Sequence, residues 1–333
     1  MKILSLENLL LAWREFRRGK RAKPDVQKFE LNLEDNLFKI HRELADKTYR
    51  NAPYDSFYIT DPKLRHIHKA SVKDRVVHQA VFRVLYPMYD AGFVFDSYSC
   101  RVDRGTHRGV ARLEHFLGQV SRNFHGPAYA LKCDIRKFFD TVDHGVLLGL
   151  IRKKAHDLST LWLLKQIVDS FSVSPGKGIP LGNVTSQLFS NIYLNELDQF
   201  VKHKFKLKHY LRYCDDFIIL HKSREYLVGL VPDIANFLHQ TLKLELHGRK
   251  VVIRKFRQGV DFLGYVALPH YRVLRTITKR RMLKKVQLKR LELKQGLVDQ
   301  SSFRQSVNAY LGVCQHCRAF GVSRKLIAHS GHK

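Results

Sequence analysis

Two segments in the middle of the chain have the hydrophobic pattern of β-strands. "PAYALKCDI" (127–135) is strand-like and ends at Asp134. "HYLRYCDDFIIL" (209–220) predicts two strands joined by a turn that holds Asp215 and Asp216. The second segment is therefore expected to form a hairpin with two neighbouring carboxylates at its tip.

Apolar residues recur at helical spacing in other segments, which predicts amphipathic helices. Three of them lie around the predicted strand and hairpin, at residues 145–157, 159–171 and 186–205. Residues 1–20 predict a further helix, because charged residues interrupt their apolar run and no signal-peptide cleavage site follows it. No stretch approaches the roughly 20 apolar residues that cross a membrane, so we expect no membrane segment.

The C-terminal region, residues 271–333, is the most basic part of the chain, with 15 Lys and Arg against two acidic residues. Within it, residues 278–296 have the composition of a helix with a basic surface. The apolar residues that can pack on one face of this helix are Met282, Val286 and Leu293. The basic face of this helix could simply be solvated. The large excess of basic over acidic residues favours contact with nucleic acid instead.

Composition agrees with a folded polyanion-binding protein. The 333 residues are 44% hydrophobic and can form one large core or two to three linked subdomains. The 59 Lys and Arg residues exceed the 30 Asp and Glu residues and leave a net charge of +29. This charge is far more than solubility requires, and it favours nucleic acid over an anionic membrane as the partner.

The five cysteines are scattered and odd in number, so we expect no disulfide framework and a reducing, cytoplasmic location. Cys314 and Cys317, followed by His329 and His332, imitate a zinc finger. The two histidines are closer together than in most zinc fingers. We therefore favour a helix with two buried thiols over a zinc site.

The adjacent Asp215 and Asp216 repel each other unless a cation lies in front of them. If the strand ending at Asp134 pairs beside the hairpin, three carboxylates meet at one end of a small antiparallel sheet. Two divalent cations roughly 3.5 to 4 Å apart would neutralise them, and oxygen ligands favour Mg²⁺ or Mn²⁺ over zinc. Such a site suits phosphoryl transfer, in a nuclease or in a polymerase.

Five motifs in this order resemble the motif series of reverse transcriptases. They are "CDIRKFFDTVDH", "GIPLGNVTSQLFSNIYLNELDQF", "YCDD", "LELHGRKVVI" and "FLGY". The resemblance implies an α+β right-hand polymerase fold with fingers, a palm that contains a small antiparallel sheet, and a helical thumb. We expect an N-terminal helical extension at residues 1–54, interleaved fingers and palm at 55–270, and a basic thumb at 271–333.

The resemblance also implies roles for individual residues. The catalytic carboxylates would be Asp134, Asp215 and Asp216, which with Ile135 would hold two Mg²⁺ or Mn²⁺ ions. The deoxynucleotide would contact Lys73, Arg75, Phe139, Gln187 and Lys250. Template and primer would contact Arg101, Gly105, Gly182, Phe262, Leu263, Gly264, Tyr265, Lys284, Lys285, Lys289 and Arg290.

Three of these roles compete with plainer interpretations. Phe139 is expected to be a gate that rejects the 2′-hydroxyl of ribonucleotides, whereas the alternative is a core aromatic; Phe138 beside it is expected to be core. Lys73 and Arg75 match a segment that grips the triphosphate, and their alternative is a surface ion-pair helix. Lys250 matches a lysine that protonates the departing pyrophosphate, although a lone lysine is more often solvated.

Within the family, "LGNVTSQ" (181–187) resembles the enzymes of diversity-generating retroelements, most of which have Ser-Pro in place of Ser186-Gln187. "RGTHRGVARL" (104–113) and "NAYLGVCQHCRAFG" (308–321) resemble them too. That resemblance implies an RNA template, a cDNA/RNA duplex with errors at template adenines, and a small basic oligomeric accessory protein. The alternatives are an antiphage-defence or group II intron-like reverse transcriptase, and an inactive RNA-binding scaffold.

Overall fold

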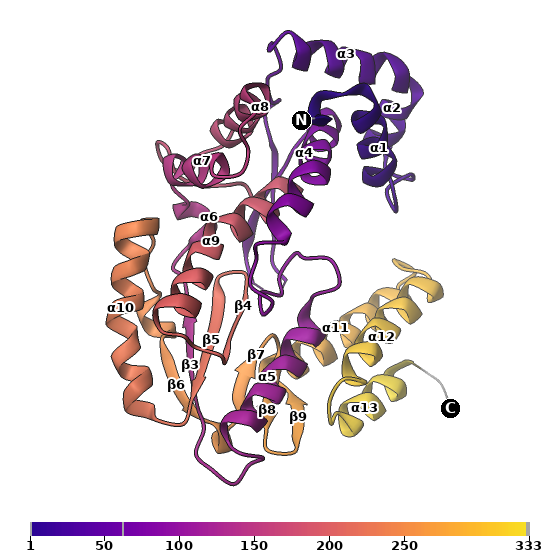
Figure 1. Ribbon diagram of the computed structural model, residues 1–333. Coiled ribbons are helices and arrows are strands. Elements are labelled where there is room, and N and C mark those ends of the chain that lie inside the picture. The colour runs from indigo at the N-terminus through magenta and orange to yellow at the C-terminus, as the bar shows by residue number, and fades with distance from the viewer. Residues whose placement is uncertain (1, 62, 331–333) are drawn as a thin grey trace.

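The computed structural model describes residues 2–61 and 63–330, in which α-helices pack around three antiparallel sheets (Figure 1). The largest, the palm sheet, has the strand order β4-β5-β3-β6. Its strands are β3 (Tyr129–Asp134), β4 (Tyr210–Tyr213), β5 (Asp216–His221) and β6 (Val252–Lys255). The other two sheets comprise β1 (Asp55–Ile59) with β2 (Arg65–Lys69), and β7 (Val260–Phe262), β8 (Tyr265–Leu268) and β9 (Tyr271–Leu274).

The helices surround these sheets and make up most of the chain (Figure 1). They are α1 (Leu6–Phe16), α2 (Pro24–Leu31), α3 (Leu33–Ala45), α4 (Val72–Asp90), α5 (Thr106–Val120), α6 (Phe138–Thr141), α7 (His144–Arg152), α8 (Leu158–Asp169), α9 (Val184–Lys204), α10 (Arg224–Leu242), α11 (Thr276–Lys294), α12 (Gln300–Cys314) and α13 (Phe320–Ser330). None of the helices in the described residues is long and apolar enough to cross a membrane.

The palm sheet separates two hydrophobic cores, because successive side chains of a strand point to opposite faces. In β3, Leu131 and Cys133 pack with α9 and α10, whereas Ala130 belongs to the core shared with α5 and the C-terminal helices. Lys132 and Asp134 alternate with the first pair, so they emerge on the α5 face of the sheet. The alternation of side chains along β3 thus buries Leu131 and Cys133 and places Lys132 and Asp134 on the opposite face.

The N-terminal helices α1, α2 and α3 pack against α4 and share the core that lies under α9. Trp13 and Leu9 are fully buried there, and the Asn8 side chain donates to the Ala80 carbonyl of α4 at 3.1 Å. Ser5 caps α1 by accepting from the Asn8 amide, which makes the helix shorter than the predicted 1–20. The expected boundary between residues 54 and 55 stays a prediction.

The C-terminal helices α11, α12 and α13 form a three-helix unit beside the β7-β8-β9 sheet (Figure 1). Met282 and Val286 of α11 are buried and Leu293 is half-buried, as the hydrophobic pattern predicted. The other predicted elements are present with shifted ends. The helix predicted at 145–157 ends at Arg152, because Asp157 caps the next helix by accepting from the Thr160 amide at 2.8 Å.

Candidate active site

The two carboxylate-bearing strands meet as the sequence predicted. β3 and β5 pair antiparallel, and Asp134 lies directly opposite Asp216 at the end of the ladder. Asp215 lies in the turn between β4 and β5, where its carbonyl accepts a hydrogen bond from the Ile135 amide at 3.2 Å. Cys214, which precedes it, has a φ of +55°, in the left-handed region that side-chain-bearing residues rarely adopt. Asp134, Asp215 and Asp216 therefore share one end of the palm sheet.

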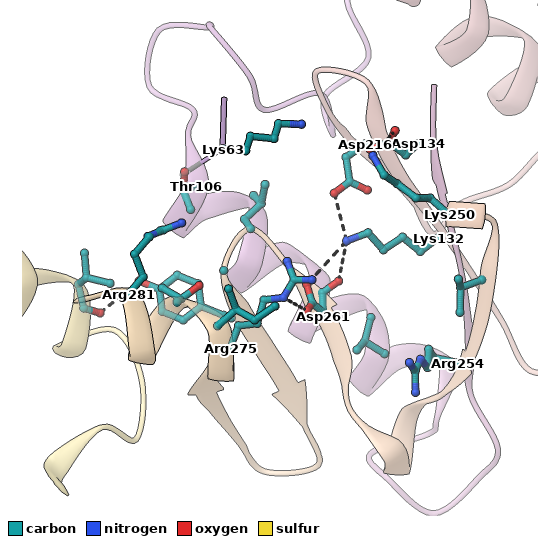
Figure 2. A pocket seen from close by; sticks show the side chains of 18 of the residues that line it. Lys63, Thr106, Lys132, Asp134, Asp216, Lys250, Arg254, Asp261, Arg275 and Arg281 are labelled. Atoms are coloured by element: carbon teal, nitrogen blue, oxygen red, sulfur yellow. Dashed lines mark hydrogen bonds and ion pairs between the residues drawn. The ribbon is translucent and has the colours of Figure 1, made fainter. Parts of the chain in front are cut away.

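The protein's own lysines contact two of these carboxylates (Figure 2). Lys250 Nζ lies 2.9 Å from Asp134 Oδ1, and Lys132 Nζ lies 3.2 Å from Asp216 Oδ2. Burial raises the pKa of Asp216 to about 6 in spite of Lys132, and Asp134 and Asp215 contribute to the rise. Burial and the charge of Asp134 also raise the pKa of Asp215. Burial and the neighbouring carboxylates thus make the ionised forms of Asp215 and Asp216 less favourable than in water.

The donor set fits a hard divalent cation. Asp216 Oδ1 is buried and has no hydrogen-bond partner among the described residues, so one carboxylate oxygen is available as a ligand. Ile135 lies opposite Leu246 in an isolated β-bridge, whose two hydrogen bonds involve the Asp134 carbonyl and the Arg136 amide. The Ile135 carbonyl takes no part in this bridge. Across the described residues, however, no three His, Cys, Asp or Glu side chains already converge on a cation position.

A cleft of about 900 Å³ opens in front of Asp134 and Asp216, and basic residues dominate its wall (Figure 2). The β1-β2 hairpin, the palm sheet, the β7-β8 turn and α11 all contribute to it. Its charged lining residues are Lys63, Arg65, Lys132, Asp134, Asp216, Arg249, Lys250, Arg254, Asp261, Arg275 and Arg281. A basic cleft that ends in a carboxylate cluster suits a polyanionic substrate with phosphate groups.

Lys73 and Arg75, predicted to grip a triphosphate, lie away from this cleft. Lys73 pairs with Glu43 at 3.0 Å, and Arg75 pairs with Asp25 at 2.7 Å, so both fasten α4 to the N-terminal helices. These contacts favour the ion-pair interpretation, and the triphosphate role of Lys73 and Arg75 stays a prediction. The cleft instead receives Lys63 and Arg65 from the β1-β2 hairpin.

Sequence reasoning missed Lys63 and Arg65, although "DPKLR" places one basic residue between β1 and β2 and another at the start of β2. The Lys63 charge acts on the turn between β4 and β5, since it partly offsets the rise in the pKa of Asp215. Asp261 was also missed. Lys132 Nζ lies 3.7 Å from Asp261 Oδ1 and 3.2 Å from the Asp261 carbonyl, so one lysine joins Asp216 to the strand before the "FLGY" turn.

The Arg101 side chain is buried and bonds to neighbouring parts of its own chain. Its side chain is only 5% exposed, and it donates to Asp90 and to the carbonyls of Val94 and Ser97. It therefore stabilises its own loop, and its expected contact with the template stays a prediction. Gly105, with a φ of +132°, precedes α5, whose first residues Thr106 and His107 line the cleft.

The remaining nucleotide candidates lie on the loops that flank the sheet. Phe138 is buried, as expected, whereas Phe139 is half-buried at the edge of the same core. Gly182 is exposed and adopts a φ of +114° beside Ile67 of the β1-β2 hairpin. Gln187 is exposed on the first turn of α9. These positions agree with the expected roles without testing them.

The "FLGY" segment forms the tight turn between β7 and β8. Leu263 and Gly264 both have positive φ values, of 50° and 88°. Leu263, Gly264 and Tyr265 line the cleft, whereas Phe262 is fully buried and anchors the turn. Three of the four expected primer-contacting residues thus face the cleft.

The four basic residues predicted on the thumb helix have mixed surroundings. Lys284 and Arg290 are exposed, Lys285 pairs with Asp61 of the fingers, and Lys289 donates to Ser306 at 2.7 Å. The basic residues of this region that line the cleft are instead Arg275, just before α11, and Arg281.

The zinc alternative falls partly outside the described structure. Cys314 is buried at the end of α12, and the Cys317 thiol is half-buried and donates to the Cys314 carbonyl at 3.6 Å. The side chain of His329 and the whole of His332 lie outside the residues that the structure describes.

Comparison with known proteins identifies the family. The family described as "Reverse transcriptase (RNA-dependent DNA polymerase)" matches residues 60–267, more than half of the chain. The group II intron-encoded protein LtrA of Lactococcus lactis is 27% identical over 303 residues, which cover 70% of this chain and 49% of LtrA. Protein YkfC of Escherichia coli is 26% identical over 266 residues, which cover 68% of this chain and 69% of YkfC.

The chain therefore spans about half the length of the intron-encoded relative. Among solved structures, apo telomerase from Candida tropicalis aligns with a TM-score of 0.52 and 14% identity, over 83% of this chain and 60% of that one. This likeness supports the fold, and with the family match it confirms the expected right-hand polymerase architecture of fingers, palm and thumb. The chain belongs to the reverse transcriptase family.

Proposed function

We propose that this chain is an RNA-directed DNA polymerase that extends a primer with deoxynucleotides. The observation that carries the proposal is the pairing of Asp134 with Asp216 beside Asp215, where the buried Asp216 Oδ1 has no hydrogen-bond partner in the described part of the chain. Family membership supplies the reaction class, and the basic cleft supplies a surface for an RNA template and a growing duplex.

The carboxylates of Asp134, Asp215 and Asp216, with the Ile135 carbonyl, would hold Mg²⁺. When bound, the cation supplies activation of the primer 3′-hydroxyl and neutralises charge on the phosphates. Lys132 stays between Asp216 and Asp261 and limits the repulsion among the carboxylates. The protein side chains thus orient the reacting groups and balance their charge.

Lys63 and Arg65 extend from the fingers into the cleft, where their charges can bind the triphosphate. Lys250 Nζ lies 2.9 Å from Asp134 Oδ1, at the edge of the cleft. Its ammonium group would donate a proton to the departing pyrophosphate. Phe139 would exclude the 2′-hydroxyl of a ribonucleotide.

We further propose that the enzyme makes error-prone cDNA in a diversity-generating retroelement, with a small basic accessory protein as partner. The exposed Gln187, at the start of α9 and near Gly182, supports this assignment, since it presents a donor and an acceptor in place of proline. The likeness to LtrA favours the group II intron-like alternative.

The test is to copy a defined RNA, annealed to a DNA primer, with four deoxynucleotides and Mg²⁺, and to sequence the product. Full-length cDNA supports polymerase activity, and errors concentrated at template adenines support the retroelement assignment. Uniform low error would favour the intron-like or defence alternative. A lack of extension with either Mg²⁺ or Mn²⁺ would support an inactive RNA-binding scaffold.

A further inference from the structure

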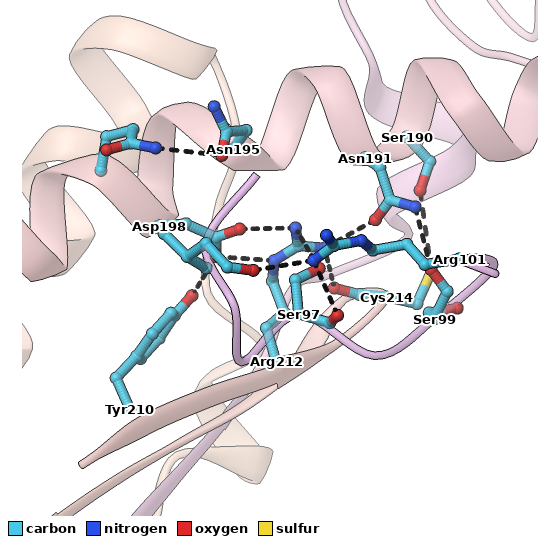
Figure 3. A network of polar contacts seen from close by, with 12 residues as sticks. Ser97, Ser99, Arg101, Ser190, Asn191, Asn195, Asp198, Tyr210, Arg212 and Cys214 are labelled. Atoms are coloured by element: carbon cyan, nitrogen blue, oxygen red, sulfur yellow. Dashed lines mark hydrogen bonds and ion pairs between the residues drawn. The ribbon is translucent and has the colours of Figure 1, made fainter. Parts of the chain in front are cut away.

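Arg212, in the β4 strand that leads to the catalytic turn, is fully buried and has every N–H donor engaged (Figure 3). Nε and Nη2 donate to the two carboxylate oxygens of Asp198 at 2.7 and 2.6 Å. The other three bonds go to Asn191 Oδ1 at 3.3 Å, the Ser97 hydroxyl at 3.1 Å and the Cys214 carbonyl at 3.1 Å. A guanidinium has five donors, so this one is saturated.

The acceptors come from separate parts of the fold. Asp198 and Asn191 belong to α9, and Ser97 lies in the loop that Arg101 braces from its other side. Cys214 belongs to the turn that presents Asp215. The Arg212 guanidinium therefore connects α9, the loop that contains Ser97, and the turn between β4 and β5.

Stability of the fold alone does not require this arrangement. Asp198 and Arg212 are both 0% exposed, and a buried ion pair is often no more stable than an apolar pair of similar volume. What an apolar pair lacks is the bond to the Cys214 carbonyl. That carbonyl belongs to the peptide that joins Cys214 to Asp215, and Cys214 holds the uncommon φ of +55°.

We infer that Arg212 is a positioning residue, which fixes the Cys214–Asp215 peptide and thereby the orientation of the Asp215 carboxylate, while Asp198 holds the guanidinium in place. This inference rests on the proposed function, since it assigns Asp215 to cation binding. Lysine cannot substitute, because its three donors do not form a planar fork that reaches Asp198 and the carbonyl together.

The test uses the double variant Arg212→Met/Asp198→Leu, in which neither charge is left unpaired in the core. We expect a folded protein with unchanged affinity for an RNA/DNA duplex and a deoxynucleotide KM close to that of the wild type. The kcat should fall by about 100-fold, the effect of a displacement of roughly 1 Å at a reacting group. A kcat within about threefold of wild type, in a folded double variant, would overturn the inference.

Arg212→Lys is the second variant, for use if the double variant does not fold. It keeps a positive charge beside Asp198. It should lose kcat in the same way, and wild-type kcat in a folded Arg212→Lys variant would also overturn the inference. Tyr210→Phe is the matched control. It removes the hydroxyl bond to Asp198 Oδ1 at 2.5 Å but leaves the bond from Arg212 to the Cys214 carbonyl intact, so kcat should stay near wild type.

Binding of Mn²⁺ to the protein without nucleotide separates this inference from the proposed function. If the wild-type chain extends no primer, the proposed function fails, yet the Mn²⁺ affinities can still be compared. Weaker Mn²⁺ binding in Arg212→Lys than in Tyr210→Phe supports the positioning role. Equal affinities in these two variants would contradict it.

Discussion

Asp134 faces Asp216 across the pairing of β3 with β5, and a different lysine contacts each of them. Lys250 lies beside Asp134, and Lys132 reaches Asp216 and Asp261 (Figure 2). Each lysine therefore supplies a positive charge next to one of the paired carboxylates.

Lys63 and Arg65 should contribute to deoxynucleotide binding. Changing both to Ala removes two charges from the cleft and should raise the deoxynucleotide KM by about tenfold for each side chain removed. The matched control is Lys73→Ala/Arg75→Ala, which removes the same charge from the seam between α4 and the N-terminal helices. The control should lower the melting temperature and leave KM unchanged. A larger KM effect in the control would return the triphosphate role to Lys73 and Arg75.

Phe139→Ala should allow ribonucleotide incorporation while activity with deoxynucleotides is retained. Removing the half-buried ring opens the volume that a 2′-hydroxyl needs. The companion variant Phe138→Ala should be destabilised by about 3 to 5 kcal/mol, because Phe138 is fully buried. Incorporation of each nucleotide type and thermal melting are measured for both variants. Unchanged sugar discrimination in Phe139→Ala would make Phe139 a core residue.

The salt dependence of duplex binding should depend on the cleft-facing arginines of the thumb region. Arg275→Ala/Arg281→Ala should reduce the slope of log affinity against log salt by about 0.7 to 0.9 for each phosphate that the protein no longer neutralises. Lys284→Ala/Arg290→Ala changes the same charge on exposed side chains. If the second pair changes the slope as much as the first, the exposed face of α11 binds nucleic acid too.

His78 should make stability depend on pH. It is buried between Asn51 and Thr185, and burial lowers its pKa from 6.5 to about 4, against the charge of Asp74. The unfolded chain therefore binds the proton more tightly than the native protein between these pH values. Stability is complete above about pH 6.5 and falls by about 3 kcal/mol as the pH decreases to 4.

The variant His78→Gln should lack this component of the pH dependence. Melting temperatures of the variant and the wild type are compared from pH 4 to 7, so that contributions from other groups cancel in the difference. A constant difference over the whole range would show that His78 does not titrate as its burial predicts.

Local pattern was enough to predict the strand that ends at Asp134 and the "YCDD" turn, because both depend on neighbouring residues. The pairing of β3 with β5, which brings the carboxylates together, joins distant parts of the chain and was only assumed from the sequence. It did not identify Asp261, which meets Lys132 only through the packing of β7 beside the palm sheet. Arg212 looked like any strand residue, since its five acceptors lie in segments that come together only on folding. The ion pairs of Lys73 and Arg75 could not be predicted locally, because they depend on the N-terminal helices that pack against α4.

Primer extension by Asp215→Asn is the most direct measurement of the central claim. We predict that extension on an RNA template is abolished with Mg²⁺, while the melting temperature at pH 7 stays equal or increases. Burial and Asp134 raise the pKa of Asp215, so a neutral side chain relieves repulsion in the folded state. Asp233→Asn, an exposed change of the same type on α10, should extend the primer like wild type. Wild-type extension by Asp215→Asn would contradict the proposed active site.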